Sequence, residues 1–322
     1  MNAAFVLAGG ALLDALAGDP RWLPHPVRAM GAATSLGERV ARRWTVGDAR
    51  RELFAGGVLT LAVVASSYAL PRVALGLVAR VDRRAALALG IALAWTTLAA
   101  RDLLAESAAV IAALEAGDLP RARARVARIV GRDTAHLDAS EIARATIETL
   151  AESACDGIVA PLCALACGGV PLAFAFKAAS TLDSMIGHIE APYTAFGRVA
   201  ARLDDVACFV PARVTALAIC AIAPRDTDGS GVRSAWRTWR RDGRAHASPN
   251  AGQSESAFAG ALGVRLGGAN VYDGVAHAAP RLGPEFRAPD ASDVRRARRA
   301  VVRVTIVVAL ALCALRVWID AR

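Results

Sequence analysis

Residues 18–28 bring together side chains that could carry acid–base chemistry: the carboxylate of Asp19, the imidazole of His25 and the guanidiniums of Arg21 and Arg28. Prolines at positions 20, 24 and 26 predict a stiff, extended loop here, because proline fixes φ and cannot donate a backbone hydrogen bond. The loop directly follows an apolar segment. An acid, a base and cations held rigidly at that point indicate catalysis at a membrane surface.

A stripe of four acidic residues is a second candidate site: Glu141, Glu148, Glu152 and Asp156. Their spacing of seven, four and four residues puts them on one face of a helix. Like charges at i and i+4 repel by roughly a few tenths of a kcal/mol. The stripe is therefore either a solvated face or a site where a cation, such as the Mg²⁺ of a bound phosphate, offsets the repulsion. The spacing alone leaves both open.

Two further segments place ionisable groups beside apolar stretches. Lys177 is the only lysine among 38 basic residues, and Asp183 follows it. A compact ammonium suits a phosphate or an activated carboxylate, and a lysine that snorkels at a helix end is the alternative. Arg202 precedes Asp204 and Asp205 just before another apolar segment. A functional site and a simple Arg202–Asp205 ion pair both fit this pattern.

The last polar motif is the run His-Ala-Ser-Pro-Asn-Ala-Gly at residues 246–252, followed by Glu255. Gly252, Ser256 and Gly260 form a small-residue stripe that permits close approach by either a helix or a ligand. The chain contains no G-x-x-x-x-G-K-[ST] motif, no G-x-G-x-x-G behind a strand and no H-E-x-x-H. A nucleotide would therefore have to bind without a familiar phosphate loop.

The composition indicates a multi-pass membrane protein. Hydrophobic residues make up 55% of the 322 residues, and the mean hydropathy of +0.38 is too high for an ordinary soluble domain. The net charge of +9 does not indicate nucleic-acid binding, because aromatic residues are only 5% and most arginines flank apolar segments. The six cysteines include no C-x-x-C pair, which argues against a zinc ribbon or a redox dithiol.

The predicted fold class is all-α, a polytopic membrane protein whose helices position these motifs. Apolar segments lie at about 1–18, 53–79, 85–100, 158–176, 207–223 and 300–319. A helix needs about 20 residues to cross the bilayer core, so we expect four or five spans in a single integral-membrane domain over residues 1–322. Segment 158–176 contains two prolines and the pair Gly168-Gly169, and is predicted to be broken or re-entrant.

Polar, helical regions at about 19–52, 101–157 and 224–299 connect these segments. The first and last are rich in arginine, which places them in the cytoplasm by the positive-inside tendency. Region 101–157 is predicted to form two amphipathic helices split near Gly131. The pair Asp138 and Glu141 predicts a capping box at the start of the second, which we expect to run to about Cys155. Residues 177–206 can share the cytoplasmic side only if segment 158–176 returns without crossing.

In their order along the chain, the polar motifs resemble the CobD/CbiB family, the adenosylcobinamide-phosphate synthases of cobalamin biosynthesis. The resemblance rests on Gly18-Asp19-Pro20, His25-Pro26-Val27-Arg28, Val130-Gly131-Arg132-Asp133-Thr134, Glu148 with Glu152 and Asp156-Gly157, Lys177 with Leu182-Asp183-Ser184, Arg202-Leu203-Asp204-Asp205, Pro211-Ala212-Arg213, Ser248-Pro249-Asn250-Ala251-Gly252 and Arg265-Leu266-Gly267-Gly268. Each motif alone is weak, whereas the ordered set is specific. The chain departs from the family pattern at Ser153, Ser180 and Cys208, where asparagine is usual.

The resemblance implies a multi-pass enzyme of the inner membrane that joins aminopropanol, or its O-phosphate, to the free propionate of adenosylcobyric acid as an amide. A carboxylate does not condense with an amine at neutral pH, so the resemblance implies activation by ATP and Mg²⁺, most simply through an acyl phosphate. It implies no tightly bound prosthetic group and no nucleic-acid partner. The expected partners are the small-molecule substrates and the lipid bilayer, and other late cobalamin-pathway enzymes are further candidates.

The resemblance and the chemistry of the side chains together suggest roles for the motif residues. We expect catalytic roles for Asp19, His25, Lys177, Asp183 and Arg202. Expected substrate- or phosphate-binding residues are Arg28, Arg132, Arg213, Ser248, Asn250, Arg265 and Asn270. Expected ligands of Mg²⁺ are Glu152, Asp156, Asp204 and Asp205.

Two other functional classes fit parts of the pattern. One is a non-catalytic membrane sensor or regulator similar to the AmpE relatives of this family, and the other is a small-molecule transporter. A transporter needs charge in the middle of its spans, whereas here almost all charge lies at segment ends and in loops. This distribution favours an enzyme with its site at the membrane surface.

Overall fold

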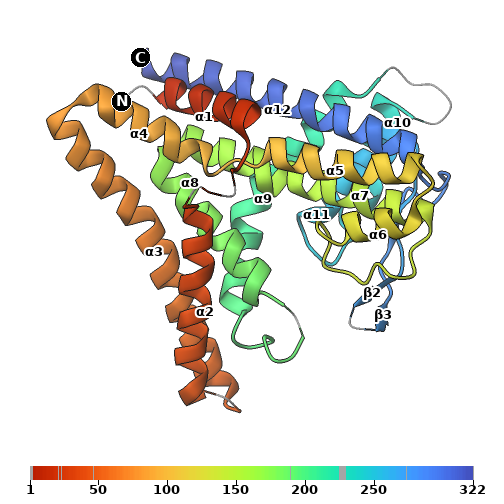
Figure 1. The fold of residues 1–322 in the computed structure, drawn as a ribbon, viewed down its shortest axis with the longest axis horizontal. Helices are drawn as coiled ribbons and strands as arrows, with labels where there is room; N and C mark the ends of the chain where they lie inside the picture. The colour runs from red at the N-terminus through yellow and green to blue at the C-terminus, as the bar shows by residue number, and fades with distance from the viewer. Residues whose placement is uncertain are drawn as a thin grey trace. The chain divides into compact units, whose positions relative to one another are not determined.

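The computed structural model describes residues 3–20, 22, 24–45, 47–188, 190–224, 230–272 and 274–321 (Figure 1). Arg21 of the first polar motif lies outside these residues. The fold is helical apart from four short strands in the described part. The chain forms two compact units, Met1–Ala99 with Ala160–Cys208 and Ala309–Arg322, and Ala100–Val159 with Phe209–Val308. The expectation of a single domain over residues 1–322 stays a prediction.

The first unit is built around a long, interrupted helix, α8 (Ala160–Ile186), which packs against four others. These are α1 (Ala3–Ala17), α2 (Pro26–Thr45), α3 (Ala49–Val81) and α4 (Arg83–Trp95). The unit also holds the first part of α9 (Arg198–Ile222). Asp82 ends α3 and begins α4, where its side chain accepts a hydrogen bond from the Arg84 N–H at 2.7 Å.

The first polar motif is a loop only as far as His25. Helix α2 begins at Pro26, so Val27 and Arg28 are helical, and the prediction of an extended loop up to Arg28 was wrong. Proline is tolerated in the first turn of a helix because the N–H groups there have no intrahelical acceptor. The proline at position 26 therefore starts a helix instead of preventing one.

The predicted break in segment 158–176 is confirmed at Gly169. Its φ of 68° and ψ of −162° lie outside the helical region and kink α8, and a side chain would be strained there. That the segment returns without crossing the membrane stays a prediction.

The structure confirms an all-α, polytopic fold with the expected number of spans. In the described part, five helical stretches are long and apolar enough to cross a membrane: Ala49–Val81, Arg83–Glu115, Ala139–Ile186, Arg198–Ile222 and Ala291–Asp320. Helix α1 is apolar but shorter. The side of the membrane on which each loop lies stays a prediction.

The second unit is organised around α7 (Ala139–Ala154), which contacts α5 (Ala100–Glu115), α6 (Leu119–Val126) and α11 (Ala251–Leu262). The core between α5, α6 and α7 consists of Val110, Ala113, Ala122, Val126, Ile142 and Ala145. Region 101–157 therefore holds three helices instead of the predicted two. The extra break follows Gly117, whose φ of 70° ends α5, and Asp118 caps α6.

The predicted capping box of α7 is confirmed. The Asp138 side chain accepts from the Glu141 N–H at 2.8 Å, and the Glu141 carboxylate accepts from the Asp138 N–H at 3.0 Å. The helix ends at Ala154, one residue before the predicted end, and continues into a π-helical turn at Cys155–Val159.

The small-residue stripe of α11 packs against another helix. A Cβ on Gly260 would collide with the Ser234 carbonyl oxygen of α10 (Val232–Asp242), and one on Gly252 would lie 2.6 Å from the His246 Cβ. Close packing is thus sufficient to account for this stripe.

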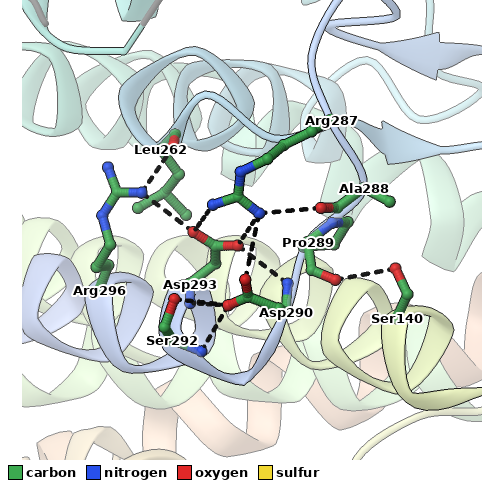
Figure 2. Close-up of polar contacts among 9 residues, drawn as sticks. All are labelled: Ser140, Leu262, Arg287, Ala288, Pro289, Asp290, Ser292, Asp293 and Arg296. Atoms are coloured by element: carbon green, nitrogen blue, oxygen red, sulfur yellow. Dashed lines mark hydrogen bonds and ion pairs between the residues drawn. The ribbon is translucent and has the colours of Figure 1, made fainter. Parts of the chain in front are cut away.

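The N-terminal part of α12 (Ala291–Asp320) is fixed by a buried carboxylate (Figure 2). Asp293 accepts two hydrogen bonds from Arg287, at 2.7 and 2.8 Å, and one from Arg296 at 3.1 Å. Arg296 also donates to the Leu262 carbonyl at the end of α11. The fully buried carboxylate orients Arg296, and the hydrogen bond from Arg296 to Leu262 links α12 to the end of α11.

Candidate active site

A polar cavity of about 230 Å³ lies within the second unit. Its polar lining includes Arg132, Glu148, Thr149, Glu152, His246, Glu255 and Asn270. Arg132, Glu152 and Asn270 are predicted site residues, and the structure brings them to one cavity from three separate segments. This cavity is the candidate active site.

Glu148 is buried in the cavity wall between two arginines. Its carboxylate pairs with Arg132 and, at 3.1 Å, with Arg144. It also accepts a hydrogen bond from the Gly267 N–H at 2.7 Å. The three side chains are only 7 to 11% exposed, so these charge-assisted bonds lie largely out of water. Within this buried group one carboxylate balances only one of the two guanidiniums, and the exposed carboxylate of Glu152 lies at the same cavity.

Asn270 joins the same network through its side-chain oxygen. The oxygen accepts hydrogen bonds from Arg132 at 2.5 Å and from Arg144 at 3.1 Å. Arg144 also donates to the carbonyls of Gly267 and Ala269, at 3.1 and 3.3 Å. These bonds hold residues 267–270 against α7.

The glycines of the 267–270 loop are required by its backbone. Gly267 and Gly268 have φ values of 71° and 99°, where an L side chain is strained. A Cβ on Gly267 would also collide with the Pro280 carbonyl oxygen. The loop lies between β1 (Leu266–Gly267), which pairs with β4 (Arg281–Leu282), and β2 (Asn270–Tyr272), which pairs with β3 (Val275–His277). These pairings fix the position of Asn270.

The acidic stripe is divided among several roles. Glu141 caps the helix, Glu148 is paired with arginines, and Glu152 is exposed at the cavity one turn later. Asp156 is half-buried in the π-helical turn and is not among the residues that line the cavity. The two arginines neutralise Glu148, so the i and i+4 pair with Glu152 is tolerated without a metal ion.

Glu255 and His246 add two titratable groups to the cavity. Burial raises the pKa of the Glu255 carboxyl well above its usual value, and the nearby carboxylates of Glu148 and Glu152 raise it further. Burial lowers the pKa of His246 below its usual value. Nδ1 of His246 accepts from the Ser248 N–H at 3.0 Å, so the proton of the neutral ring is on Nε2. In both groups burial favours the neutral form beside the arginines.

The predicted binding residues Arg213, Ser248 and Asn250 hold the loop before α11. Ser248 Oγ accepts from the N–H groups of Asn250 and Ala251, both at 3.2 Å. Arg213 donates to Asn250 Oδ1 at 2.8 Å and to the Pro249 carbonyl at 3.2 Å. In this structure these polar groups position His246 and the start of α11 instead of lining the cavity.

Arg265 is also not among the cavity-lining residues. It is half-buried, and its backbone N–H donates to the Arg287 carbonyl at 2.8 Å. This contact lies beside the Arg287–Asp293 pair at the start of α12.

The first unit contains the predicted Asp19–His25 pair. Nε2 of His25 lies 3.2 Å from the Asp19 carboxylate, and its Nδ1 is 3.3 Å from the Val27 N–H, which donates to it. The imidazole is only 8% exposed, so the carboxylate of Asp19, which is 35% exposed, is the more accessible base. Arg28 is exposed on the first turn of α2.

The other predicted catalytic and metal-binding residues also belong to the first unit. Lys177 and Asp183 are half-buried on α8. On α9, Arg202 pairs with Asp205 at 3.6 Å and is 75% exposed, and Asp204 lies 3.8 Å from the Cys208 sulfur. The ion pair weighed as the alternative therefore forms. That these residues share a site with the cavity stays a prediction.

The donor set of the cavity suits Mg²⁺ only when phosphate accompanies the ion. In the described residues, no group of three or more His, Cys, Asp or Glu is placed to hold a metal ion. Mg²⁺ commonly binds through one or two carboxylates, with phosphate oxygens and water completing its shell. Glu152 is exposed at the cavity, near the arginines that would bind the phosphates, and fits this role.

Three polar residues of the cavity were assigned no role from the sequence: Thr149, His246 and Glu255. Glu148 was predicted only as a member of the acidic stripe. A further polar group, Arg144, supports the cavity from outside its lining. The i and i+4 spacing of Arg144 and Glu148 was visible as a helical ion pair. Nothing in the sequence indicates that residues 267–270 complete that pair.

Comparison with known proteins places the chain in one family. The model of the CobD/CbiB proteins matches residues 7–301. A cobalamin biosynthesis protein CobD of Geobacter metallireducens is 45% identical over 294 residues, which cover 90% of each chain. Another CobD, of Pelobacter propionicus, is 42% identical over 95% of this chain and 93% of its own. A cobalamin biosynthesis protein CbiB of Salmonella typhimurium is 39% identical over 94% of each. No solved structure shows significant similarity. The chain belongs to the CobD/CbiB family.

Proposed function

We propose that this protein catalyses the ATP-dependent formation of an amide in cobalamin biosynthesis. The acid is the propionate of adenosylcobyric acid, and the amine is (R)-1-amino-2-propanol or its O-phosphate. The product is adenosylcobinamide or its phosphate. Membership of the CobD/CbiB family along nearly the whole chain supports the role in cobalamin biosynthesis. The multi-pass fold supports a location in the cytoplasmic membrane.

The observation that carries the chemistry is the arrangement of Arg132, Arg144 and Glu148 beside Glu152. Two guanidiniums that share one buried carboxylate offer preorganised positive charge to phosphate oxygens. Glu152 offers an exposed carboxylate to the Mg²⁺ that accompanies those phosphates. Burial favours the neutral forms of Glu255 and His246, which lowers the charge that they place near the phosphates.

The proposed reaction has two steps. Transfer of the γ-phosphoryl group of ATP to the propionate carboxylate forms an acyl phosphate and ADP, and replaces a poor leaving group with phosphate. The amine nitrogen then attacks the acyl carbon, phosphate leaves, and the nitrogen loses one proton. Arg132, which lines the cavity, stabilises the negative charge that develops on the transferred group, and Arg144 adds positive charge from behind Glu148. The residues predicted to receive the proton, Asp19 and His25, belong to the first unit.

A complementation experiment tests the proposal against the regulator and transporter alternatives. A host that lacks the synthase is supplied with cobyric acid and expresses either this protein or its Glu152→Gln variant. We expect the wild-type gene to restore cobalamin synthesis and the variant to fail at equal protein level. A regulator or a transporter would not restore synthesis in a host that takes up cobyric acid normally. Rescue by both genes would exclude the role of Glu152.

A further inference from the structure

A second cavity of the second unit lies between α5 and α12 and has a different character. Its volume is about 200 Å³, and its lining is Leu104, Arg295, Arg298, Arg299 and Val302. We call it the arginine pocket. Three of its five lining residues are cations, and the other two are aliphatic, so it combines positive charge with an apolar wall.

The positive charge of the arginine pocket is only partly compensated. Arg295 pairs with Glu115 at the end of α5. Arg298 donates to the Leu104 carbonyl at 3.0 Å, while its Nε is buried and has no acceptor among the described residues. Within the part of the chain that the structure describes, neither Arg298 nor Arg299 has a carboxylate partner. Two guanidiniums therefore have donor capacity that the protein does not use.

The position of the pocket along α12 is where the helix changes from polar to apolar. Residues 300–319 are largely apolar, and Ala291–Asp320 is long and apolar enough to cross a membrane. Val302 and Ile306 follow Arg299 on the same helical stripe and are 40 and 53% exposed. Arginines at the end of a span lie at the depth of the lipid headgroups, and the exposed aliphatic stripe lies beside the acyl chains.

We propose that the arginine pocket binds the phosphate of an anionic phospholipid from the surrounding bilayer. A guanidinium offers a planar pair of N–H donors to phosphate oxygens, and Arg298 and Arg299 provide two such groups. The acyl chain lies along Val302 and Ile306. Free phosphate would satisfy the arginines but leave this stripe unused, and a zwitterionic lipid would bring a cation to a site that already carries excess positive charge.

The test measures lipid binding to the full-length protein in neutral detergent. Phosphatidylglycerol, phosphatidylcholine and inorganic phosphate are each titrated, and bound lipid is counted by native mass spectrometry. We expect one saturable phosphatidylglycerol, weaker phosphatidylcholine binding and no effect of inorganic phosphate at the same concentration. Equal binding of the two lipids, or effective competition by inorganic phosphate, would overturn the proposal.

Matched substitutions separate a specific site from general attraction. Arg298→Gln and Arg299→Gln remove pocket charges, and Arg303→Gln removes an exposed arginine one turn further along that does not line the pocket. We expect the pocket variants to weaken phosphatidylglycerol binding by roughly tenfold or more. Arg303→Gln should weaken phosphatidylglycerol binding by no more than roughly fivefold, which is the effect expected of a single arginine near anionic lipid. Arg299→Lys, which restores the charge, should recover part of the binding. Equal weakening by all three glutamine variants would contradict a built site.

Discussion

The carboxylate of Glu148 on α7 accepts a hydrogen bond at 2.7 Å from the backbone N–H of Gly267, a residue 119 positions further along the chain. This bond joins the acidic helix to the glycine loop that carries Asn270. Because Arg132 and Arg144 bind the same carboxylate, Glu148 is the common partner of the positive groups at the cavity. We therefore regard it as a positioning residue.

Replacement of Glu148 by glutamine tests this role. Glu148→Gln keeps the shape but leaves two buried guanidiniums without a counter-charge. We expect it to lower the free energy of unfolding by roughly 1–3 kcal/mol. Thermal unfolding of the detergent-purified protein measures the effect. Glu152→Gln, one turn along and exposed, is the control and should leave the melting temperature nearly unchanged. Equal melting temperatures for all three proteins would contradict the positioning role.

Gly267 in the glycine loop and Gly274 in the turn between β2 and β3 offer a matched pair of substitutions. Gly267 and Gly274 both have positive φ, at 71° and 77°, but only Gly267 is crowded, because a Cβ on Gly274 would meet nothing within 4 Å. Gly274→Ala should cost the roughly 1–2 kcal/mol of left-handed strain. Gly267→Ala should cost more and reduce activity, since the loop must move away from Pro280. Thermal unfolding and product formation measure the two effects, and a milder effect at Gly267 would refute this account of the loop.

Burial of Glu255 predicts a specific pH dependence of stability. Its folded pKa is raised above the usual value of 4.5, so the unfolded chain loses its proton first and stability falls as the pH rises above that value. His246 has a lowered folded pKa, so its contribution is lost as the pH falls below its usual 6.5. Glu255→Gln should flatten the decline of the melting temperature toward high pH. A wild-type and variant pair with parallel pH profiles would show that Glu255 is ionised in the folded protein.

The local structure of α7 and α8 was predictable because short-range chemistry determines it. The Asp138–Glu141 capping box and the break near Gly168-Gly169 follow from residue types at fixed spacing, and both are present. The prediction for the start of α2 was wrong because a proline can either break a helix or occupy its first turn. Only the residues that follow the proline distinguish the two cases.

The strand pairs and the partners of Glu148 were not predictable from the sequence. The strands have only two or three residues each, too few for an alternating pattern. Arg132, Glu148 and Asn270 come together through tertiary contacts over 16 to 138 residues, which no local spacing records. The sequence therefore identified members of the site without showing which of them touch.

Membrane topology is tested by labelling of a single cysteine. On a background without the native cysteines, Glu190→Cys lies in the connection between α8 and α9. If segment 158–176 returns without crossing, a membrane-impermeant thiol reagent added from the periplasm should not label this position. Labelling from the periplasm would overturn the re-entrant prediction, and would also remove Lys177, Asp183 and Asp204 from any cytoplasmic active site.

The most direct test of the central claim is product formation by the purified protein. Detergent-solubilised protein is incubated with adenosylcobyric acid, ATP, Mg²⁺ and either aminopropanol or its O-phosphate, and the corrinoids are analysed by mass spectrometry. We expect adenosylcobinamide or its phosphate from the wild type and from Glu141→Gln, whose side chain only caps α7. Glu152→Gln should express normally and form no product. Persistent absence of product from the wild type, beside an active homologue, would contradict the proposed enzyme and favour the regulator.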